Sequence, residues 1–335
     1  MRVETTGYAT TLREAGEQGS AAERDGYDSY WATETKSDVF LGAAAAIRET
    51  SAITVGTGIA VALARNPMTV AIQANDLQLD SGGRFALGLG PQVKAHITRR
   101  FSMDYSAPAA RMREFVLAIR AIWEAWEASG ELDFSGEHYS HTLMTPMFDP
   151  GPNPHGNPPI HLAAVGPLMN EVAGEVADGV AVHGFCTERY LREVILPALG
   201  RGAERAGRSL DGFEMNTPGF VVIGDTEAER AEGLEAVRQQ VGFYGSTPAY
   251  RRVLELHGWE ELGERLTAMS KRGEWDALAS AIDDEVLDAF SVVGTAEEVG
   301  DSLRERYGDV ATRVTLWGQG GETRERVASR LGVDA

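Results

Sequence analysis

The residues best suited to chemistry lie in the stretch LGLGPQVKAHITRRF, residues 87–101. It combines Gly88 and Gly90 with Lys94 and two arginines, a composition suited to holding a phosphate or a flat ligand. A dinucleotide fingerprint would need a third glycine where Val93 stands, and the GK[ST] ending of a P-loop is missing. We therefore expect the glycines to let the backbone approach a flat ligand, with the charges near that ligand's edge.

The elements that must position this loop alternate between strands and helices. Helix signals follow most strands, among them Pro67 and Pro167 at helix starts and two capping-box spacings, Thr226 with Glu229 and Thr295 with Glu298. The predicted strands cover residues 1–5, 28–34, 52–61, 84–90, 160–166, 178–185, 213–224 and 312–318. Eight such β/α units predict a TIM barrel, an α/β (β/α)8 fold with insertions. A doubly wound sheet is the alternative, but it usually carries a phosphate fingerprint after an early strand.

No second domain boundary is visible, so we expect a single domain over residues 1–335. A Pro/Gly-rich insertion is predicted at about 130–158 and a helical insertion at about 240–290. Functional side chains of a barrel lie at the C-terminal ends of its strands. The candidates that follow from this rule are Glu34, Thr35, Gly58, Ile59, Gly90, Gln92, Lys94, His96, Ala164, Val165, Gly166, His183 and Gly184.

Composition restricts the partners. The formal net charge of −19 argues against nucleic acid and anionic membranes, but not against a small anionic ligand at a local positive site. No apolar run reaches the ~18 residues of a membrane span, and the N-terminus lacks signal-peptide character. Cys186 is the only cysteine, which suits a reducing cytoplasm. The histidines and Cys186 show no recognised metal spacing, so no metal site is predicted.

The chain resembles the luciferase-like superfamily of flavin and deazaflavin enzymes, and within it the actinobacterial oxidoreductases that use coenzyme F420. The similar segments include GYDSYWATET, ITVGTGIAVALARNP, DLQLDSGGRFALGLGPQVKAHITRRF, PPIHLAAVGPLMNEVAGEVADGVAVHGF and FSVVGTAEEV. Their order and spacing together carry the resemblance, which covers nearly the full length.

The resemblance implies a cofactor at the C-terminal mouth of the barrel. It implies a cis peptide bond at Gly58–Ile59 against the back face of the ring, and a phosphate near Ala164, Val165 and Gly166 and near His183 and Gly184. The helix that starts at Pro167 would favour an anion there. Gln92 would suit the amide edge of the ring.

The chain also departs from the family pattern. Glu34 stands at the acidic position after the second strand, but Thr35 replaces the histidine that many relatives use as a base. The loop GPQVK lacks the carboxylate that several relatives carry after the fourth strand. The remaining candidates for proton transfer are Glu34, Lys94, His96 and His183.

The leading hypothesis is a coenzyme F420-dependent oxidoreductase that moves a hydride between the deazaflavin C5 and a small organic substrate. The first alternative is a two-component monooxygenase that uses reduced FMN. The second is a cofactor-binding paralogue without catalysis. The resemblance also leads us to expect a homodimer, because superfamily members often are.

Overall fold

Eight parallel strands form the centre of the molecule in the computed structural model, which describes residues 1–332. The strands run in the order β10-β9-β8-β5-β3-β2-β1-β13, with the short β4 pairing with β5. A bridge between Asn216 and Arg313 and a hydrogen bond from Thr217 N to Arg313 O (2.9 Å) connect the two ends of this sheet. The predicted (β/α)8 TIM barrel is confirmed.

The barrel strands are short and buried. Their bounds are β1 (Arg2–Gly7), β2 (Ser29–Ala32), β3 (Thr54–Thr57), β4 (Ala60–Val61), β5 (Phe85–Gly90), β8 (Ile160–Ala164), β9 (Gly179–Val182), β10 (Glu214–Met215) and β13 (Arg313–Thr315). Every residue of β2 and β5 is buried. Such near-continuous apolar runs are expected for parallel strands, because helices cover their outer side.

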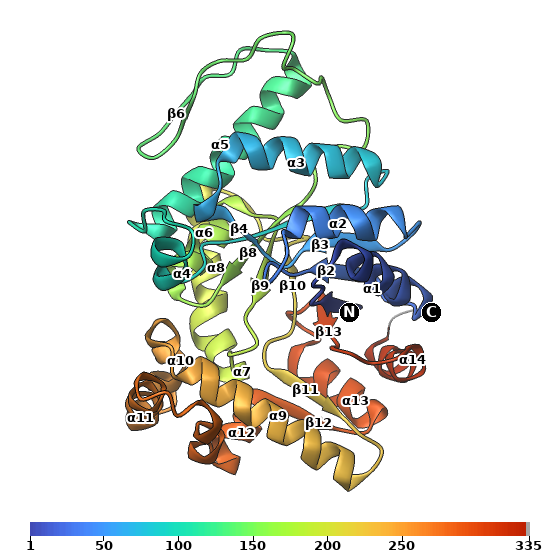
Figure 1. Cartoon of the computed structure of the whole chain (residues 1–335), viewed down its shortest axis with the longest axis vertical. Helices are drawn as coiled ribbons and strands as arrows, with labels where there is room; N and C mark the ends of the chain where they lie inside the picture. The colour runs from blue at the N-terminus through green and yellow to red at the C-terminus, as the bar shows by residue number, and fades with distance from the viewer. Residues whose placement is uncertain (333–335) are drawn as a thin grey trace.

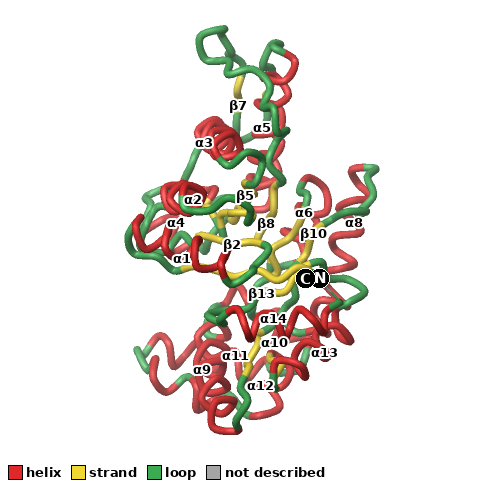
Figure 2. The backbone as a smooth tube through the Cα atoms, turned by 90° about the vertical axis from the view of Figure 1, so that its right-hand side faces the viewer, coloured by secondary structure: helices red, strands yellow, loops and turns green. Residues whose placement is uncertain are grey.

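The helices that follow these strands surround the barrel (Figures 1 and 2). They are α1 (Leu12–Arg24), α2 (Val39–Arg48), α3 (Pro67–Asp80), α4 (Lys94–Arg99), α5 (Pro108–Ala128), α6 (Pro167–Val176), α7 (Glu188–Tyr190), α8 (Leu196–Ala206), α13 (Ala296–Tyr307) and α14 (Gly321–Leu331). Pro67 and Pro167 stand in the first turns of α3 and α6, as predicted.

Two additions lie beyond the barrel at opposite ends of the molecule's longest axis, which is vertical in Figure 1. The Pro/Gly-rich segment contains the hairpin of β6 (Phe134–Ser135) and β7 (Ser140–His141). The other addition joins α9 (Glu227–Gly245), α10 (Arg251–Leu256), α11 (Glu260–Lys271) and α12 (Asp284–Phe290) to a two-stranded parallel sheet of β11 (Phe220–Ile223) and β12 (Ser291–Gly294). Both predicted capping boxes are present, at the starts of α9 and α13.

Two predicted strands are divided in the structure. The segment 213–224 contributes β10 to the barrel and β11 to the separate sheet. Pro218 lacks an N–H for a strand ladder, and Gly219 adopts a positive φ of 79°, so the chain turns between the two strands. The segment 52–61 is divided into β3 and β4 at Gly58–Ile59, whose peptide bond is cis as the resemblance implied.

No helix among residues 1–332 is both long and apolar enough to cross a membrane.

Candidate functional site

A cavity of about 260 Å³ extends from the barrel interior to the C-terminal ends of the strands. Its floor contains polar side chains of four strands, and its mouth is formed by residues that follow the strands and by Tyr244 of the helical insertion. The floor residues are Glu4, Trp31, His161 and Arg313; the mouth residues include Tyr8, Thr33, Gly58, Ile59, His183, Gly184 and Tyr244. We refer to it as the mouth cavity.

A buried ion pair organises the floor. Trp31 Nε1–H donates to Glu4 Oε2 (2.8 Å), and Arg313 Nη1 lies 3.3 Å from the same oxygen. The hydroxyl of Thr315 donates to Glu4 Oε1 (2.7 Å). The guanidinium carbon of Arg313 also lies 5.0 Å from the ring centre of Trp31, within cation–π range. Both carboxylate oxygens of Glu4 are therefore occupied, and its charge is balanced.

His161 and Glu214 continue this polar network toward the start of β10. His161 Nε2 lies 3.0 Å from Glu214 Oε2. Burial by itself would raise the pKa of Glu214, but contact with His161 and the charge of Arg313 outweigh it and lower that pKa to about 2. Burial lowers the pKa of His161. We infer a neutral imidazole beside an ionised carboxylate.

Three floor nitrogens make no hydrogen bond. Arg313 Nε and both ring nitrogens of His161 are buried without a hydrogen-bond partner of good geometry among residues 1–332, although Glu214 Oε2 lies near His161 Nε2. Buried polar groups nearly always find a partner, so each exception needs an explanation. Other atoms of both side chains line the mouth cavity, so its floor is polar.

Backbone forms one wall of the cavity because two glycines allow strands and side chains to approach closely. A Cβ on Gly88 would lie 1.9 Å from the carbonyl oxygen of Thr57. The Thr57 hydroxyl instead donates to Gly88 O (2.7 Å) and accepts from Gly88 N (2.9 Å). A Cβ on Gly58 would lie 2.9 Å from Trp31 Cβ. Only glycine fits at either position without displacement of its neighbour.

His183 is held in one tautomer at the mouth. Its Nδ1 accepts from the backbone N–H of Phe185 (2.9 Å), so the ring proton is assigned to Nε2. The ring lies between Tyr244 and Tyr250, with centroid distances of 4.6 and 4.8 Å. Burial lowers the pKa of His183 to about 4. The neutral ring can donate a hydrogen bond from Nε2, but its other nitrogen is already occupied.

A family model described as "Luciferase-like monooxygenase" matches residues 1–313. The chain belongs to the luciferase-like monooxygenase family.

Two relatives and one solved structure illustrate its place in the family. The chain is 50% identical over 303 residues to the uncharacterized protein Rv1360 of Mycobacterium tuberculosis, covering 90% of this chain and 89% of that protein. It is 28% identical to the 5,10-methylenetetrahydromethanopterin reductase of Archaeoglobus fulgidus, covering 93% and 92%. The structure of the coenzyme F420 dependent tetrahydromethanopterin reductase of Methanopyrus kandleri superposes with a TM-score of 0.79 at 22% identity, covering 98% of this chain and 96% of that one.

Within this family fold, the structure brings only part of the predicted site together. Gly58, Ile59, His183 and Gly184 line the mouth cavity. Gly90 ends β5 against Ile59, whose Cδ1 would lie 2.8 Å from a Cβ at that glycine.

Glu34 lies beside the mouth in a different set of contacts. Its Oε2 accepts from Val61 N and from Arg65 Nη1, both at 2.7 Å, and its side chain is only 7% exposed. Arg65 also pairs with Asp38 at 2.9 Å. The Glu34 carboxylate thus fixes the chain after β4. Thr35 is exposed, and its carbonyl accepts from Arg100 (2.8 Å); the neighbouring Thr33 lines the cavity instead.

The predicted residues of the loop after β5 lie outside the mouth cavity. Lys94 and His96 are exposed on the short α4, and neither lines the mouth cavity. Gln92 has a positive φ of 61°, and its Oε1 accepts from the adjacent Val93 N (2.9 Å). The roles suggested for these three residues stay predictions.

The turn between β8 and α6 remains suited to an anion. Gly166 is the N-cap of α6, and the Asn170 side chain donates to the carbonyls of Val165 (3.3 Å) and Gly166 (3.0 Å). These bonds fix the turn and leave the first N–H groups of the helix available. Ala164 is buried at the end of β8, and the next residue inward, Ala163, lines the cavity.

Sequence reasoning missed the floor. His161 is a polar residue inside the otherwise apolar β8, and that position is the signal that could have identified it. Glu4 and Arg313 stand in strands that contain other polar residues, so they carry no such signal. The convergence of these three residues depends on barrel closure. Tyr244 lies within the helical insertion, and no sequence signal connects it with the strand ends.

Proposed function

We propose that this protein is a coenzyme F420-dependent oxidoreductase that transfers a hydride between the cofactor and a small organic substrate. The observation that carries the proposal is the mouth cavity, which joins a glycine-rich backbone wall to a polar floor of Glu4, His161 and Arg313. A flat ring with a polar edge fits both features. The similarity to reductases that include a coenzyme F420 dependent enzyme supports the choice of cofactor.

The residues that would hold the cofactor follow from the geometry. The wall at Gly58, Ile59 and Gly88 would face the ring, and Arg313 with His161 would meet its polar edge. The turn at Val165–Gly166 would take the phosphate. When bound, the cofactor supplies a hydride donor or acceptor at C5 of its deazaflavin ring.

The chain's own groups would manage protons and water at the mouth. Burial raises the pKa of Tyr244 to about 12, so its phenol stays protonated and can donate a hydrogen bond. The Nε2–H of His183 is a second neutral donor, because Nδ1 is engaged by Phe185 N–H. Both groups can stabilise negative charge that develops on a substrate oxygen. The apolar side chain of Ile59 limits the access of water.

Parallel titration of the purified protein with F420 and FMN tests the proposal. We expect F420 to bind at least about tenfold more tightly, a difference of roughly 1.4 kcal/mol. Ala163→Leu, which fills the mouth cavity, should weaken that binding, whereas Ala231→Leu on the exposed side of α9 should not. Binding without turnover of any enone, imine or alcohol would favour the cofactor-binding paralogue.

A second candidate function is an FMN-dependent two-component monooxygenase, which the description of the matching family favours. Tight binding of FMN and no binding of F420 would establish this alternative.

A further inference from the structure

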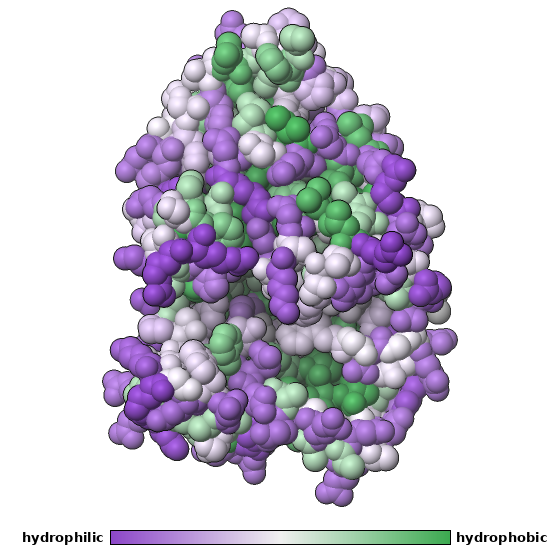
Figure 3. Space-filling view, viewed as in Figure 1, coloured by the Kyte–Doolittle hydropathy of each residue, from purple (hydrophilic) through white to green (hydrophobic). Residues whose placement is uncertain are grey.

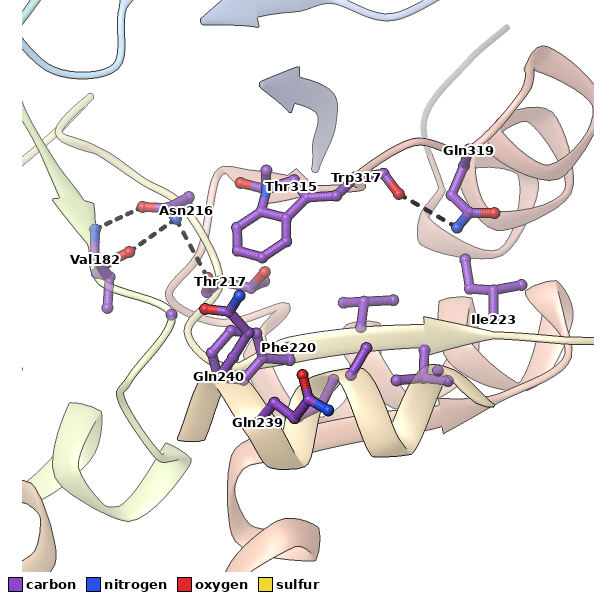
Figure 4. Close-up of a pocket in the computed structure, with 17 residues that line it drawn as sticks. Val182, Asn216, Thr217, Phe220, Ile223, Gln239, Gln240, Thr315, Trp317 and Gln319 are labelled. Atoms are coloured by element: carbon purple, nitrogen blue, oxygen red, sulfur yellow. Dashed lines mark hydrogen bonds between the residues drawn. The ribbon is translucent and has the colours of Figure 1, made fainter. Parts of the chain in front are cut away.

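A second and larger cavity, of about 420 Å³, adjoins the mouth cavity. It lies between the ends of β9, β10 and β13 on one side and β11 with α9 on the other (Figure 4). The two cavities share the wall formed by Val182, Gly184, Asn216, Thr315 and Trp317. We call this second space the side cavity. A molecule in it would lie directly beside whatever occupies the mouth.

The side cavity differs from the mouth cavity in charge. Within the part of the chain that the structure describes, no Asp, Glu, Lys, Arg or His side chain lines it. The mouth cavity, in contrast, contains Glu4, Arg313 and two histidines. Apolar side chains such as Phe220, Val222 and Val237 provide much of the side cavity's surface. Figure 3 shows an apolar hollow on the face below β13 in the view of Figure 1.

Its polar side chains are all uncharged and consist of two threonine hydroxyls, the Trp317 indole and four amides. Asn216 is committed to the backbone: its Oδ1 accepts from Val182 N (2.7 Å) and its Nδ2 donates to Val182 O (3.2 Å). Gln239 and Gln240 are exposed, and their amides make no hydrogen bond to any residue in the range 1–332. Figure 4 places the Gln240 amide beneath the ring of Trp317, beside Phe220. The rings of Phe220 and Trp317 meet edge to face at 6.0 Å.

We propose that the side cavity binds the substrate, and that this substrate is an uncharged organic molecule with an apolar body and a carbonyl or hydroxyl group. The inference rests on the proposed function, because the proposed function assigns the cofactor to the mouth cavity and leaves the side cavity for the substrate. A free amide can donate to a carbonyl or accept from a hydroxyl, and aromatic rings cover an apolar body. The other possible occupant is the anionic tail of the cofactor, but burial of an anion without a cation is costly.

A binding experiment without F420 tests the side cavity by itself. The neutral dye Nile red, added to the apo-protein, should show fluorescence enhancement. Ala236→Trp places a bulky ring in the side cavity and should weaken Nile red binding about tenfold or more, which is a difference of 1.4 kcal/mol or more. Ala231→Trp makes the same change on α9 outside the cavity and should leave the affinity unchanged. Equal affinities for the two variants would overturn the proposal.

A kinetic experiment tests the substrate class. With reduced F420, cyclohex-2-en-1-one should be turned over more efficiently than its ring-carboxylate analogue. Gln240→Lys should shift the ratio of the two kcat/KM values toward the anion by about tenfold, because it adds a charge that pairs with the carboxylate. Ala231→Lys should leave the ratio unchanged, and neither variant should alter the Kd for F420.

The outcomes separate the two proposals. If the protein fails to bind F420 but Ala236→Trp still weakens Nile red binding, the proposed function is wrong and the side cavity remains a site for neutral molecules. Tighter F420 binding by Gln240→Lys would assign the side cavity to the cofactor tail and overturn the inference. Preference of the unaltered protein for the carboxylate would also overturn it.

Discussion

The environment of a single histidine predicts how stability depends on pH. The pKa of His183 is lowered to about 4 by burial, whereas an unfolded chain has an ordinary value near 6.5. Below pH 6.5 the unfolded state therefore binds a proton that the folded state does not, so stability falls as the pH decreases toward 4. Between pH 7 and pH 5 the loss from this residue is about 2 kcal/mol.

Urea unfolding of the wild type and His183→Gln at both pH values measures this loss. The variant keeps a polar side chain but cannot titrate, so subtraction removes the contributions of the other histidines. We expect the wild type to lose about 2 kcal/mol more than the variant between pH 7 and pH 5. Equal losses would mean that His183 titrates at an ordinary pKa and is not buried as described.

Replacement of Glu34 tests whether this residue has a structural or a catalytic role. Its carboxylate holds Val61 N–H and Arg65, so Glu34→Gln should lower the free energy of unfolding by about 1–3 kcal/mol. The matched control Asp80→Asn breaks an exposed pair with Arg48 and should cost less than about 0.5 kcal/mol. Unchanged stability together with a large loss of turnover would contradict the structural role and support the catalytic one.

At the scale of elements, the packing of β3 against β5 depends on one glycine. Gly88→Ala would bring a methyl group against the Thr57 carbonyl, and neither strand can move without disturbing the barrel. We expect a loss of about 3 kcal/mol or more, or failure to fold. Gly166→Ala, at the N-cap of α6, meets nothing within 4 Å and should cost no more than about 1 kcal/mol, through the loss of a favourable cap residue. Denaturant midpoints for both variants check the contrast, and similar midpoints would refute it.

The elements themselves were predictable where the signal is local. Pro67, Pro167 and the two capping boxes mark helix starts that the structure contains, because these signals act within one turn. The pairing of β11 with β12 was not predicted. Pro218 and Gly219 are a local signal for a turn. The two strands are about 70 residues apart in the sequence, however, and nothing local indicates that β11 pairs with β12 after this turn.

At the scale of the whole molecule, the repeated alternation of strands and helices predicts the barrel, but it does not predict the floor of the mouth cavity. The resemblance to a family located Gly58 and Ile59 through a motif. Glu4, His161 and Arg313 come from strands at the two ends and the middle of the chain, and they meet only because the sheet closes. Their contacts depend on strand register, which the residue pattern alone does not specify.

The net charge of −19 supports a last prediction, for the rate at which an anionic cofactor associates. Repulsion between like charges slows encounter, and salt screens it over a Debye length of about 8 Å at physiological ionic strength. If F420 is the cofactor, its association rate should rise about threefold or more between 20 and 300 mM KCl. The uncharged ring compound deazariboflavin, measured by the same stopped-flow fluorescence, should show no such change. A rate that falls with salt would contradict this expectation. It would mean that the local field of exposed cations after β5, such as Lys94 and Arg100, dominates the field of the whole molecule.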